Sequence, residues 1–306
     1  MTIERIVDIA GESRHLSLTR GFLAVSHDRE ELGRVPLDDI AAVIVHGFGT
    51  TLSANLLSAL AQRHVFVVLC DQTHNPTACV WPLSGHHAQG ARMRGQIAAA
   101  LPMKKRLWQQ IVQAKIAAQA AVLDVAGGSV QPLLRMQQKV RSGDPDNLEA
   151  QAARHYWPRL MGSDFRRDRG QGGANAMLNY GYAVLRAATA RAIVASGLHP
   201  TIAVHHSAGH NDMALADDLM EPFRPLVDMA VRNLVAAGAR EVDAKTKATL
   251  AGLLDADMEG GQGTTTVGVS IKRTAQSLAQ CFALGATGLE LPALPPPVQL
   301  ASLGRA

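Results

Sequence analysis

The sequence predicts an α+β protein with a strand-rich first part and a larger helical second part. Over residues 6–83, short apolar runs and alternating segments are separated by turns. After WPLSGHHAQG, apolar residues recur at the 3.6-residue period of amphipathic helices. The length of 306 residues favours two domains. We therefore expect a β-rich domain over 1–85, a linker and the start of the first long helix over 86–100, and a helical domain with a proline-rich tail over 101–306.

The strand-rich part contains one hairpin and two buried strands. HLSLTRGFLAVS alternates apolar and polar residues on both sides of Arg20 and Gly21, which predicts two strands joined at that pair. DDIAAVIVHG and VFVVLCD are apolar runs typical of buried strands. Residues 53–62, after Thr50 and Thr51, have the cap and spacing of one short helix. Polar residues form no cluster here, so we expect a structural or dimerising module.

The helical part is divided by proline and glycine residues. The predicted helices are one or two over 91–126 broken at Pro102, one from Asp146 or Asn147 towards Trp157, one over 175–196 before Gly197, two in PLVDMAVRNLVAAG and KTKATLAGLLDAD, and one over 271–283. Glu149 falls in the first turn of its helix, where the helix dipole by itself favours an acidic residue. The tail LPALPPPVQLASLGRA is expected to be extended or disordered.

Charge and composition restrict the function classes. A net charge of +4 and a pI near 9.1 point weakly to a polyanionic partner. Cys70, Cys79 and Cys281 have neither a disulfide framework nor the spacing of a structural zinc site. There is no Walker A, dinucleotide glycine fingerprint or GxSxG motif. No secretory signal or apolar run of about 18 residues is visible, so we expect a cytoplasmic protein without a membrane span.

The densest group of chemically active residues is the stretch 205–225, HHSAGHNDMALADDLMEPFRP. It contains three histidines, four acidic residues and one arginine. Its apolar residues form one helical stripe: Leu215, Leu219 and Phe223. This density predicts a functional site on a helix whose apolar face packs into the protein.

Two carboxylates of this stretch share another face of the predicted helix. Asp218 and Glu221 are three residues apart, close enough to share a ligand, whereas Asp217 points elsewhere. Pro222 lacks an amide hydrogen and disfavours helical geometry at Glu221, so the helix should end or kink there. We expect this break to leave Glu221 accessible to a hard cation.

Three motifs resemble, in this order, the CRISPR-associated spacer-acquisition integrases of the Cas1 family, and most closely the branch that accompanies the Cas9 effector of type II systems. They are LEAQAARHYWPRLMG, then NAMLNYGYAVLRAATARAIVASG, then HH followed by LADDLMEPFRPLVD. The likeness includes the strands around PLDDIAAVIVHGFGTTLS and VFVVLCDQTHNPTA. It implies an amino-terminal β-sandwich, an all-helical catalytic domain and a homodimer. Two such dimers would flank a dimer of the small partner Cas2, with Cas9 as a further partner.

The resemblance also implies the site residues. The metal-binding glutamate of the family falls on Glu149, and its acidic pair matches Asp218 and Glu221, with Glu221 as direct ligand and Asp218 as auxiliary. The family histidine falls on His206, with the adjacent His205 as the alternative.

The chain departs from the pattern of its branch around the histidines. His205 offers a second imidazole, and Ala208 stands where relatives tend to carry asparagine two places after the histidine. His210 is a further extra imidazole. The choice between His205 and His206 therefore stays open at this point.

The chemistry expected from these ligands is metal-dependent DNA integration. Two carboxylates and an imidazole suit Mg²⁺ or Mn²⁺, with zinc possible on ligand type alone. The 3′-hydroxyl ends of a captured double-stranded DNA fragment would attack phosphodiesters at the edge of a CRISPR repeat. The candidate phosphate contacts are Arg154, Arg166, Arg167 and Arg224. The alternatives are a metal-dependent nuclease or phosphodiesterase that uses water, and a noncatalytic DNA-binding scaffold.

Overall fold

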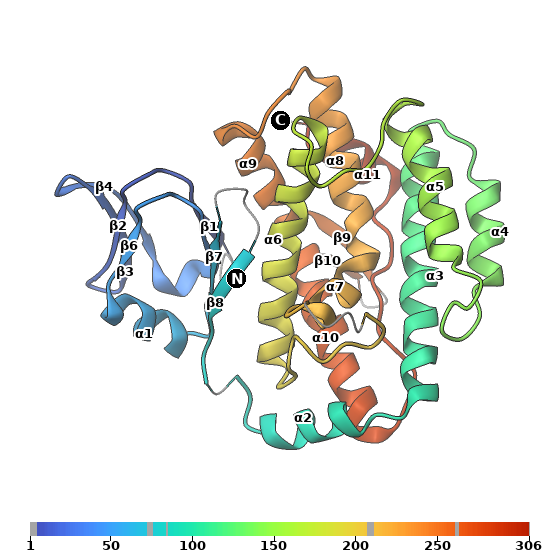
Figure 1. The fold of residues 1–306 in the computed structure, drawn as a ribbon, viewed down its shortest axis with the longest axis horizontal. Helices are drawn as coiled ribbons and strands as arrows, with labels where there is room; N and C mark the ends of the chain where they lie inside the picture. Colours follow the sequence, from blue (N-terminus) through green and yellow to red (C-terminus); the bar gives the residue numbers. More distant parts are fainter. Residues whose placement is uncertain (1–4, 72–75, 84, 207–210, 261–262, 306) are drawn as a thin grey trace. The chain divides into compact units, whose positions relative to one another are not determined.

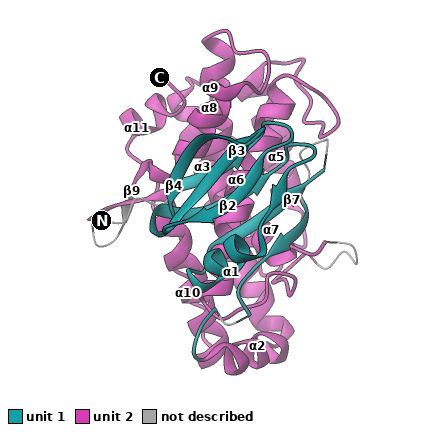
Figure 2. Cartoon of the chain, turned by 90° about the vertical axis from the view of Figure 1, so that its left-hand side faces the viewer, with its two compact units in different colours: residues 1–87 teal, residues 88–306 magenta. Residues whose placement is uncertain are grey.

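The computed structural model describes residues 5–71, 76–83, 85–206, 211–260 and 263–305. The chain divides into two compact units (Figure 2), unit 1 over residues 1–87 and unit 2 over residues 88–306. In the described ranges, no helix has both the length and the hydropathy that a membrane span needs.

The described residues of unit 1 form two four-stranded sheets and one α-helix (Figure 1). Its elements are β1 (Arg5–Ile9), β2 (His15–Thr19), β3 (Phe22–His27), β4 (Glu30–Pro36), the 3₁₀ turn η1 (Leu37–Asp39), β5 (Ile40–Val45), β6 (Thr51–Leu52), α1 (Ala54–Gln62), β7 (Phe66–Cys70) and β8 (Pro76–Val80). One sheet has the order β1-β5-β7-β8, in which only β8 is antiparallel to its neighbour. The other has the order β4-β3-β2-β6.

The local predictions for unit 1 are confirmed. β2 and β3 form an antiparallel hairpin, and both Arg20 and Gly21 at its turn have positive φ angles of 48° and 85°. β5 and β7 are the two buried runs, and Ser53 caps α1 by accepting a hydrogen bond from the amide of Leu56 at 3.3 Å. Apolar side chains from both sheets and from α1 form one core, which gives this unit its own source of stability.

Unit 2 is helical apart from a two-stranded hairpin. Its elements are α2 (Gln89–Ala98), α3 (Leu101–Val125), α4 (Gln131–Lys139), α5 (Leu148–Met161), α6 (Ala174–Ala195), α7 (Ala214–Met220), the 3₁₀ turn η2 (Glu221–Phe223), α8 (Arg224–Ala236), α9 (Ala244–Ala251), the 3₁₀ turn η3 (Gly252–Asp255), β9 (Asp257–Gly260), β10 (Gly263–Thr266), α10 (Val267–Leu284) and α11 (Pro297–Ser302). In Figure 1, α3, α4 and α5 lie side by side, while α6 packs against α7, α8, α9 and α10.

Three expectations for unit 2 are wrong in detail. The unit is not all-helical, because β9 and β10 pair as an antiparallel hairpin. The break between α2 and α3 falls at Ala99 and Ala100, and Pro102 lies in the first turn of α3, where a missing amide hydrogen costs nothing. The tail carries the short helix α11, and its Leu300 and Leu303 are buried.

The apolar stripe and the break before Pro222 are as the sequence predicts, but the expectation that the break leaves Glu221 accessible is wrong, because only 4% of its side chain is exposed. Leu215, Leu219 and Phe223 are fully buried, which confirms the apolar stripe. α7 ends at Met220, and Glu221 begins the tighter 3₁₀ turn that contains Pro222 and leads into α8. The change of helix type at Pro222 therefore separates α7 from α8 at the residue that precedes the proline.

The start of α5 is capped by a residue that the sequence did not predict. Asn147 has a positive φ angle of 51° and makes no side-chain cap, and Asp146 pairs with Arg141. The carboxylate of Asp144 instead accepts hydrogen bonds from the amides of Leu148 at 2.9 Å and Glu149 at 3.0 Å. A carboxylate at this end also interacts favourably with the helix dipole, so Asp144 fixes the first turn of α5.

We expect Asp144→Ala to lower the free energy of unfolding by about 1–2 kcal/mol, because two amides of α5 lose their acceptor. The matched control is Asp146→Ala, which removes an exposed ion pair and should cost less than about 0.5 kcal/mol. Urea unfolding followed by tryptophan fluorescence measures both. Equal losses for the two variants would show that Asp144 is not the cap on which the helix depends.

Candidate functional site

The centre of the candidate site is an ammonium group between two carboxylates. Lys115 comes from the middle of α3, Glu149 from the first turn of α5 and Glu221 from the start of η2. The Nζ of Lys115 lies 2.6 Å from Oε1 of Glu149 and 2.6 Å from Oε2 of Glu221. The two carboxylate oxygens are thus no farther apart than twice that distance. Residues far apart in the sequence converge here around one positive charge.

The convergence is largely shielded from solvent. The exposed fractions of the side chains are 12% for Lys115, 21% for Glu149 and 4% for Glu221. Nε of Arg224 forms a second ion pair with Oε1 of Glu221 at 3.2 Å. Burial alone would raise the pKa of Glu221, but Arg224 and Lys115 outweigh it and hold that pKa below its usual value. Burial opposes the charge of Lys115 as well, yet Glu221 and Glu149 raise its pKa. Glu221 and Lys115 are therefore both charged near neutral pH.

His206 is held by a fully buried aspartate. Nδ1 of His206 lies 2.5 Å from Oδ1 of Asp218, which has an exposed side-chain fraction of 0%. The hydrogen bond to Asp218 is the main cause that raises the pKa of His206, with burial opposing it and the charges of Glu221 and Glu149 adding to it. Because Nδ1 is engaged with Asp218, Nε2 is the ring nitrogen that can serve as a metal ligand.

Asp218 also accepts hydrogen bonds from the backbone of the segment that carries the histidines. Its Oδ2 accepts from the amides of Val204 and His205 at 2.8 Å each, and its Oδ1 accepts from the amide of His206 at 3.3 Å. A single buried carboxylate thus satisfies three amides and one imidazole. It fixes both the path of the segment and the orientation of the His206 ring.

His205 is engaged with an aromatic ring instead of an acid. Its imidazole is stacked on the indole of Trp108, with ring centroids 4.3 Å apart and an interplanar angle of 3°. The same indole meets His206 edge-on at 5.2 Å. Burial is the main cause that lowers the pKa of His205. The two adjacent histidines therefore differ clearly in their surroundings.

Further hydrogen bonds hold the chain on either side of the histidines. The buried amide of Gln96 in α2 donates to the carbonyls of His199 at 2.9 Å and Ile202 at 2.8 Å, and it accepts from the amide of His199 at 2.9 Å. Asp217 points away from Asp218, as predicted, and pairs with Arg186 at 2.7 Å and with Asn211 at 2.7 Å. α2, α6 and α7 together position this segment.

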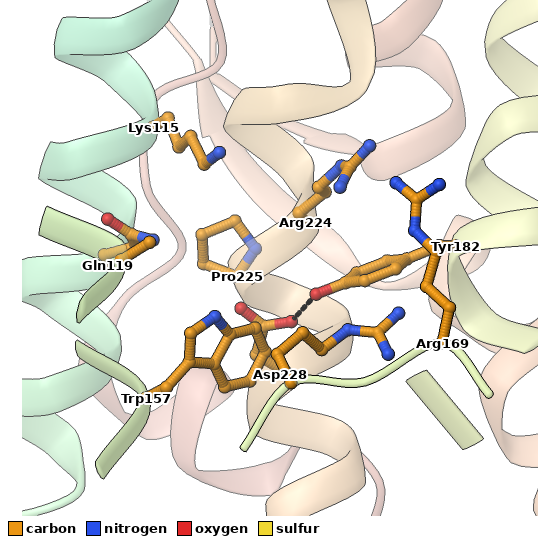
Figure 3. A pocket seen from close by; sticks show the side chains of 10 residues that line it. Lys115, Gln119, Trp157, Arg169, Tyr182, Arg224, Pro225 and Asp228 are labelled. Carbon is orange, nitrogen blue, oxygen red and sulfur yellow. Dashed lines mark hydrogen bonds between the residues drawn. The ribbon is translucent and has the colours of Figure 1, made fainter. Parts of the chain in front are cut away.

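A cavity of about 120 Å³ is lined in part by Lys115 and Arg224, the two cations that pair with Glu221 (Figure 3). Its lining contains four basic side chains and one acidic side chain: Lys115, Arg167, Arg169, Arg224 and Asp228. Tyr182 and Trp157 supply aromatic walls. Such a wall of positive charge suits an anion, so the cavity can accept a phosphate group.

The arginines of the cavity are held in defined positions. Arg167 donates to Oδ1 of Asn175 at 2.9 Å and to Oδ1 of Asn179 at 2.6 Å. Its guanidinium lies over the ring of Tyr182 at 5.5 Å, and that of Arg224 lies over the same ring at 4.9 Å. Burial is the main cause that lowers the pKa of Arg167. These contacts fix two of the positive charges before any ligand arrives.

At the base of the cavity, the hydroxyl of Tyr182 donates a short hydrogen bond to Asp228, drawn as a dashed line in Figure 3. Burial raises the pKa of Asp228 to about 7, although the bond from Tyr182 and the charges of Arg224 and Lys115 act in the opposite direction. Burial, together with the charge of Asp228, also raises the pKa of Tyr182. Asp228 is therefore half protonated near neutral pH.

The structure brings most of the predicted site residues together. Glu149 and Glu221 share Lys115, and Asp218 holds His206, whose pKa responds to both glutamates. In the part of the chain that the structure describes, no group of three or more His, Cys, Asp or Glu side chains is arranged to hold a metal ion. Ala208 and His210 lie outside the described residues.

The four predicted phosphate contacts differ in their places. Arg154 is exposed on α5, and Arg166 is exposed and donates to the carbonyls of Ser163 and Phe165. Arg167 and Arg224 line the cavity. Arg166 thus folds back on its own loop, whereas Arg154 is exposed to solvent and Arg167 and Arg224 line the cavity.

Sequence reasoning missed Lys115, Asp228 and Arg169 as parts of the site. A signal for Lys115 existed, because it interrupts a helical stripe that is otherwise buried: Trp108, Ile111, Gln119 and Val122. A charged residue in such a stripe needs a buried partner. Asp228 gave the same signal inside α8, where its neighbours Val227 and Met229 are buried.

Comparisons with known proteins place the chain in one family. The family model described as CRISPR associated protein Cas1 matches residues 8–259. A CRISPR-associated endonuclease Cas1 of Neisseria meningitidis is 40% identical over 225 residues, which cover 73% of each chain.

Solved structures share the fold at low sequence identity. A casposase bound to its integration product superposes with a TM-score of 0.79 at 21% identity, covering 94% of this chain and 92% of that one. A Cas6-RT-Cas1–Cas2 complex gives a TM-score of 0.77 at 18% identity, covering 95% of this chain and 36% of that one.

The family model covers well over half of the chain and the Neisseria relative is 40% identical, so the chain is a CRISPR-associated protein. The chain belongs to the Cas1 family.

The raised pKa of Asp228 predicts a pH-dependent contribution to stability. The folded protein binds the proton of Asp228 more tightly than the unfolded chain, whose usual value is 3.8. The free energy of unfolding of the wild type, measured relative to that of Asp228→Asn, should therefore fall as the pH rises from about 4 to about 7. The fall should be up to roughly 1.4 kcal/mol for each pH unit. Urea unfolding of both proteins from pH 5 to pH 8 measures the difference. A difference that stays flat or rises with pH would contradict the assignment.

Proposed function

We propose that this protein is a metal-dependent DNA integrase and endonuclease of CRISPR adaptation. The observation that carries the proposal is the convergence of Glu149 and Glu221 on one cation, beside a basic cavity, in a chain of the Cas1 family. The related Neisseria protein is named an endonuclease, and the casposase structure holds an integration product. Both names support chemistry on phosphodiester bonds.

The donor types of this site, two carboxylates and an imidazole, suit a divalent metal ion. Glu149 and Glu221 would supply carboxylate oxygens and His206 its Nε2, with Asp218 fixing the imidazole through Nδ1. The ammonium of Lys115 already marks a position between the carboxylates that a cation can occupy. Mg²⁺ or Mn²⁺ bound there would supply Lewis-acid stabilisation of the charge that develops on the phosphate oxygens. His206 is favoured over His205, because stacking on Trp108 engages the His205 ring.

The proposed reaction exchanges one phosphodiester for another. The 3′-hydroxyl oxygen of captured double-stranded DNA attacks a phosphorus at the edge of a CRISPR repeat, loses its proton and forms a new P–O bond. The bond from that phosphorus to the 3′-oxygen of the repeat strand breaks, and this oxygen takes up a proton. The number of phosphodiester bonds is unchanged, so the reaction needs no nucleotide hydrolysis.

The cavity and the surface near it would bind the DNA backbone. Arg167, Arg169 and Arg224 line the cavity next to the carboxylates, and Arg154 is exposed on the helix of Glu149. Such contacts determine affinity and salt dependence and leave sequence choice to other groups.

The assembly and setting follow from the family. The Cas1–Cas2 complex among the related structures supports Cas2 as a partner. We infer a homodimer, a β-sandwich arrangement of the two sheets in unit 1, association with a Cas9-type system and a place of action in the cytoplasm.

Joining assays test the proposal directly. With purified Cas2, a supercoiled plasmid bearing the repeat and a short DNA fragment, we expect Glu149→Gln and His206→Ala to lower the rate of strand joining at least about a hundredfold. His205→Ala should retain activity within about tenfold of the wild type, because the His205 ring stacks on Trp108 and is not one of the proposed metal ligands.

Two outcomes of that assay would contradict the proposal. The exposed Glu241→Gln serves as the matched control for loss of one carboxylate. Nicked products without joined strands would favour hydrolysis by water. Joining that is unaffected by Glu149→Gln would favour a scaffold without catalysis.

The salt dependence of DNA binding tests the arginines. We expect Arg154→Ala to weaken binding of duplex DNA evenly across sequences and to reduce the slope of log affinity against log salt by about 1. Arg34→Ala is the control, since Arg34 is paired with Glu31 at 2.7 Å on a strand of unit 1. Fluorescence anisotropy at several salt concentrations gives the slopes. An unchanged slope for Arg154→Ala would remove this residue from the DNA contacts.

A further inference from the structure

Lys115 stands where a divalent ion and its ligands would have to meet. Its ammonium lies 2.6 Å from an oxygen of each acidic side chain, and its own side chain is 12% exposed. The oxygens that pair with the ammonium belong to the same carboxylates that would bind the metal. The other residues of its buried stripe on α3, Trp108, Ile111, Gln119 and Val122, carry no charge, so the partners of the ammonium come from other elements.

The ammonium and a divalent ion exclude each other from this position. Both need the facing oxygens of Glu149 and Glu221, and two cations at that separation repel strongly in a shielded site. Without any cation, the two carboxylates would be left close together and desolvated, with Arg224 pairing only Glu221. One cation at a time is the stable arrangement.

The structure also offers the ammonium a second place. Lys115 lines the adjoining cavity, and Figure 3 shows its side chain at the edge of that space. The four-carbon stem of lysine turns about several bonds, so the charge can move while α3 stays fixed. The cavity contains one acidic side chain, Asp228, whose pKa already responds to the charge of Lys115. Asp228 can therefore receive the ammonium.

We propose that Lys115 holds Glu149 and Glu221 in place when no metal is bound, and that binding of a divalent cation moves its ammonium into the cavity towards Asp228. This inference rests on the proposed function in one respect, that Glu149 and Glu221 bind the metal. Lys115 is then a positioning residue. Its ammonium keeps Glu149 and Glu221 in place for metal binding and is displaced by the divalent cation.

Binding of Mn²⁺ to the purified full-length protein tests the exchange without any DNA. At pH 8, free Mn²⁺ is counted by electron paramagnetic resonance during a titration. We expect Lys115→Met to bind Mn²⁺ at least about fivefold more tightly than the wild type, because the competing ammonium is gone. Lys104→Met removes the same charge from the same helix and should leave the affinity unchanged. Equal or weaker binding by Lys115→Met overturns the proposal.

Thermal unfolding gives a second readout. Lys115→Met leaves two shielded carboxylates without their shared cation, so its unfolding temperature should be lowered in the absence of Mn²⁺ and restored by Mn²⁺. The Mn²⁺-induced rise should be larger than in the wild type. A variant that folds only with Mn²⁺ also supports the exchange. If Lys115→Met unfolds at the same temperature with and without Mn²⁺, the proposed exchange is overturned, because Mn²⁺ should take the place of the missing ammonium.

A double-mutant cycle tests the second place of the ammonium. Asp228→Asn should weaken Mn²⁺ binding in the wild-type background, because the displaced ammonium loses its acceptor. In the Lys115→Met background the same change should have a much smaller effect. Equal effects in the two backgrounds contradict a movement towards Asp228.

Glu149→Gln separates this inference from the proposed function. Mn²⁺ binding that survives Glu149→Gln unchanged places the metal elsewhere and overturns both. Mn²⁺ binding that depends on Glu149 but is indifferent to Lys115 leaves the proposed function standing and overturns only the exchange.

Discussion

The helical unit depends on neutralising two acidic side chains that packing removes from water. Glu149 and Glu221 come from elements that are far apart in the sequence, and transferring either charge from water costs several kcal/mol unless it is paired. Lys115 pairs with both and Arg224 with one of them. The contact of α3 with α5 and with η2 is therefore an electrostatic arrangement as much as an apolar one. The two buried carboxylates are stable here because Lys115 and Arg224 neutralise them.

Asp218 plays a corresponding role for the histidines. Segments without regular secondary structure leave amides that no helix or sheet satisfies, and a buried amide without an acceptor destabilises the fold. The carboxylate of Asp218 accepts from three consecutive amides and from the ring of His206. The aspartate thus stabilises the segment and orients its imidazole with the same two oxygens. Structural and chemical roles coincide in this residue.

Local patterns allowed much of the fold to be predicted. The hairpin at Arg20 and Gly21, the stripe ending at Phe223 and the change of helix at Pro222 depend on near neighbours in the sequence, so periodicity and turn chemistry reveal them. The cap of α5 by Asp144 could not be predicted in this way, because the choice among three nearby acceptors depends on the path of the preceding turn.

The site was predictable only in part, for a similar reason. Motif order pointed to Glu149 and Glu221, but Lys115 contacts them across 34 and 106 positions of the chain, and no spacing rule connects such partners. The sequence signal for Lys115 was a single charged residue within a stripe of α3 that is otherwise uncharged and buried. Asp228 gave the same signal, and its partner Tyr182 lies on a different helix. A charged residue on an otherwise buried helical face therefore indicates an ion-pair partner elsewhere in the chain, and such residues are candidates for a site.

The turn at Pro222 limits how this region can vary in length. Asp218 on α7 and Glu221 at the start of η2 serve different groups, one the histidine segment and the other Lys115. Adding one residue between them would rotate everything that follows by about 100° and carry Glu221 away from α3. Insertions and deletions are thus excluded between these two acids for reasons of geometry.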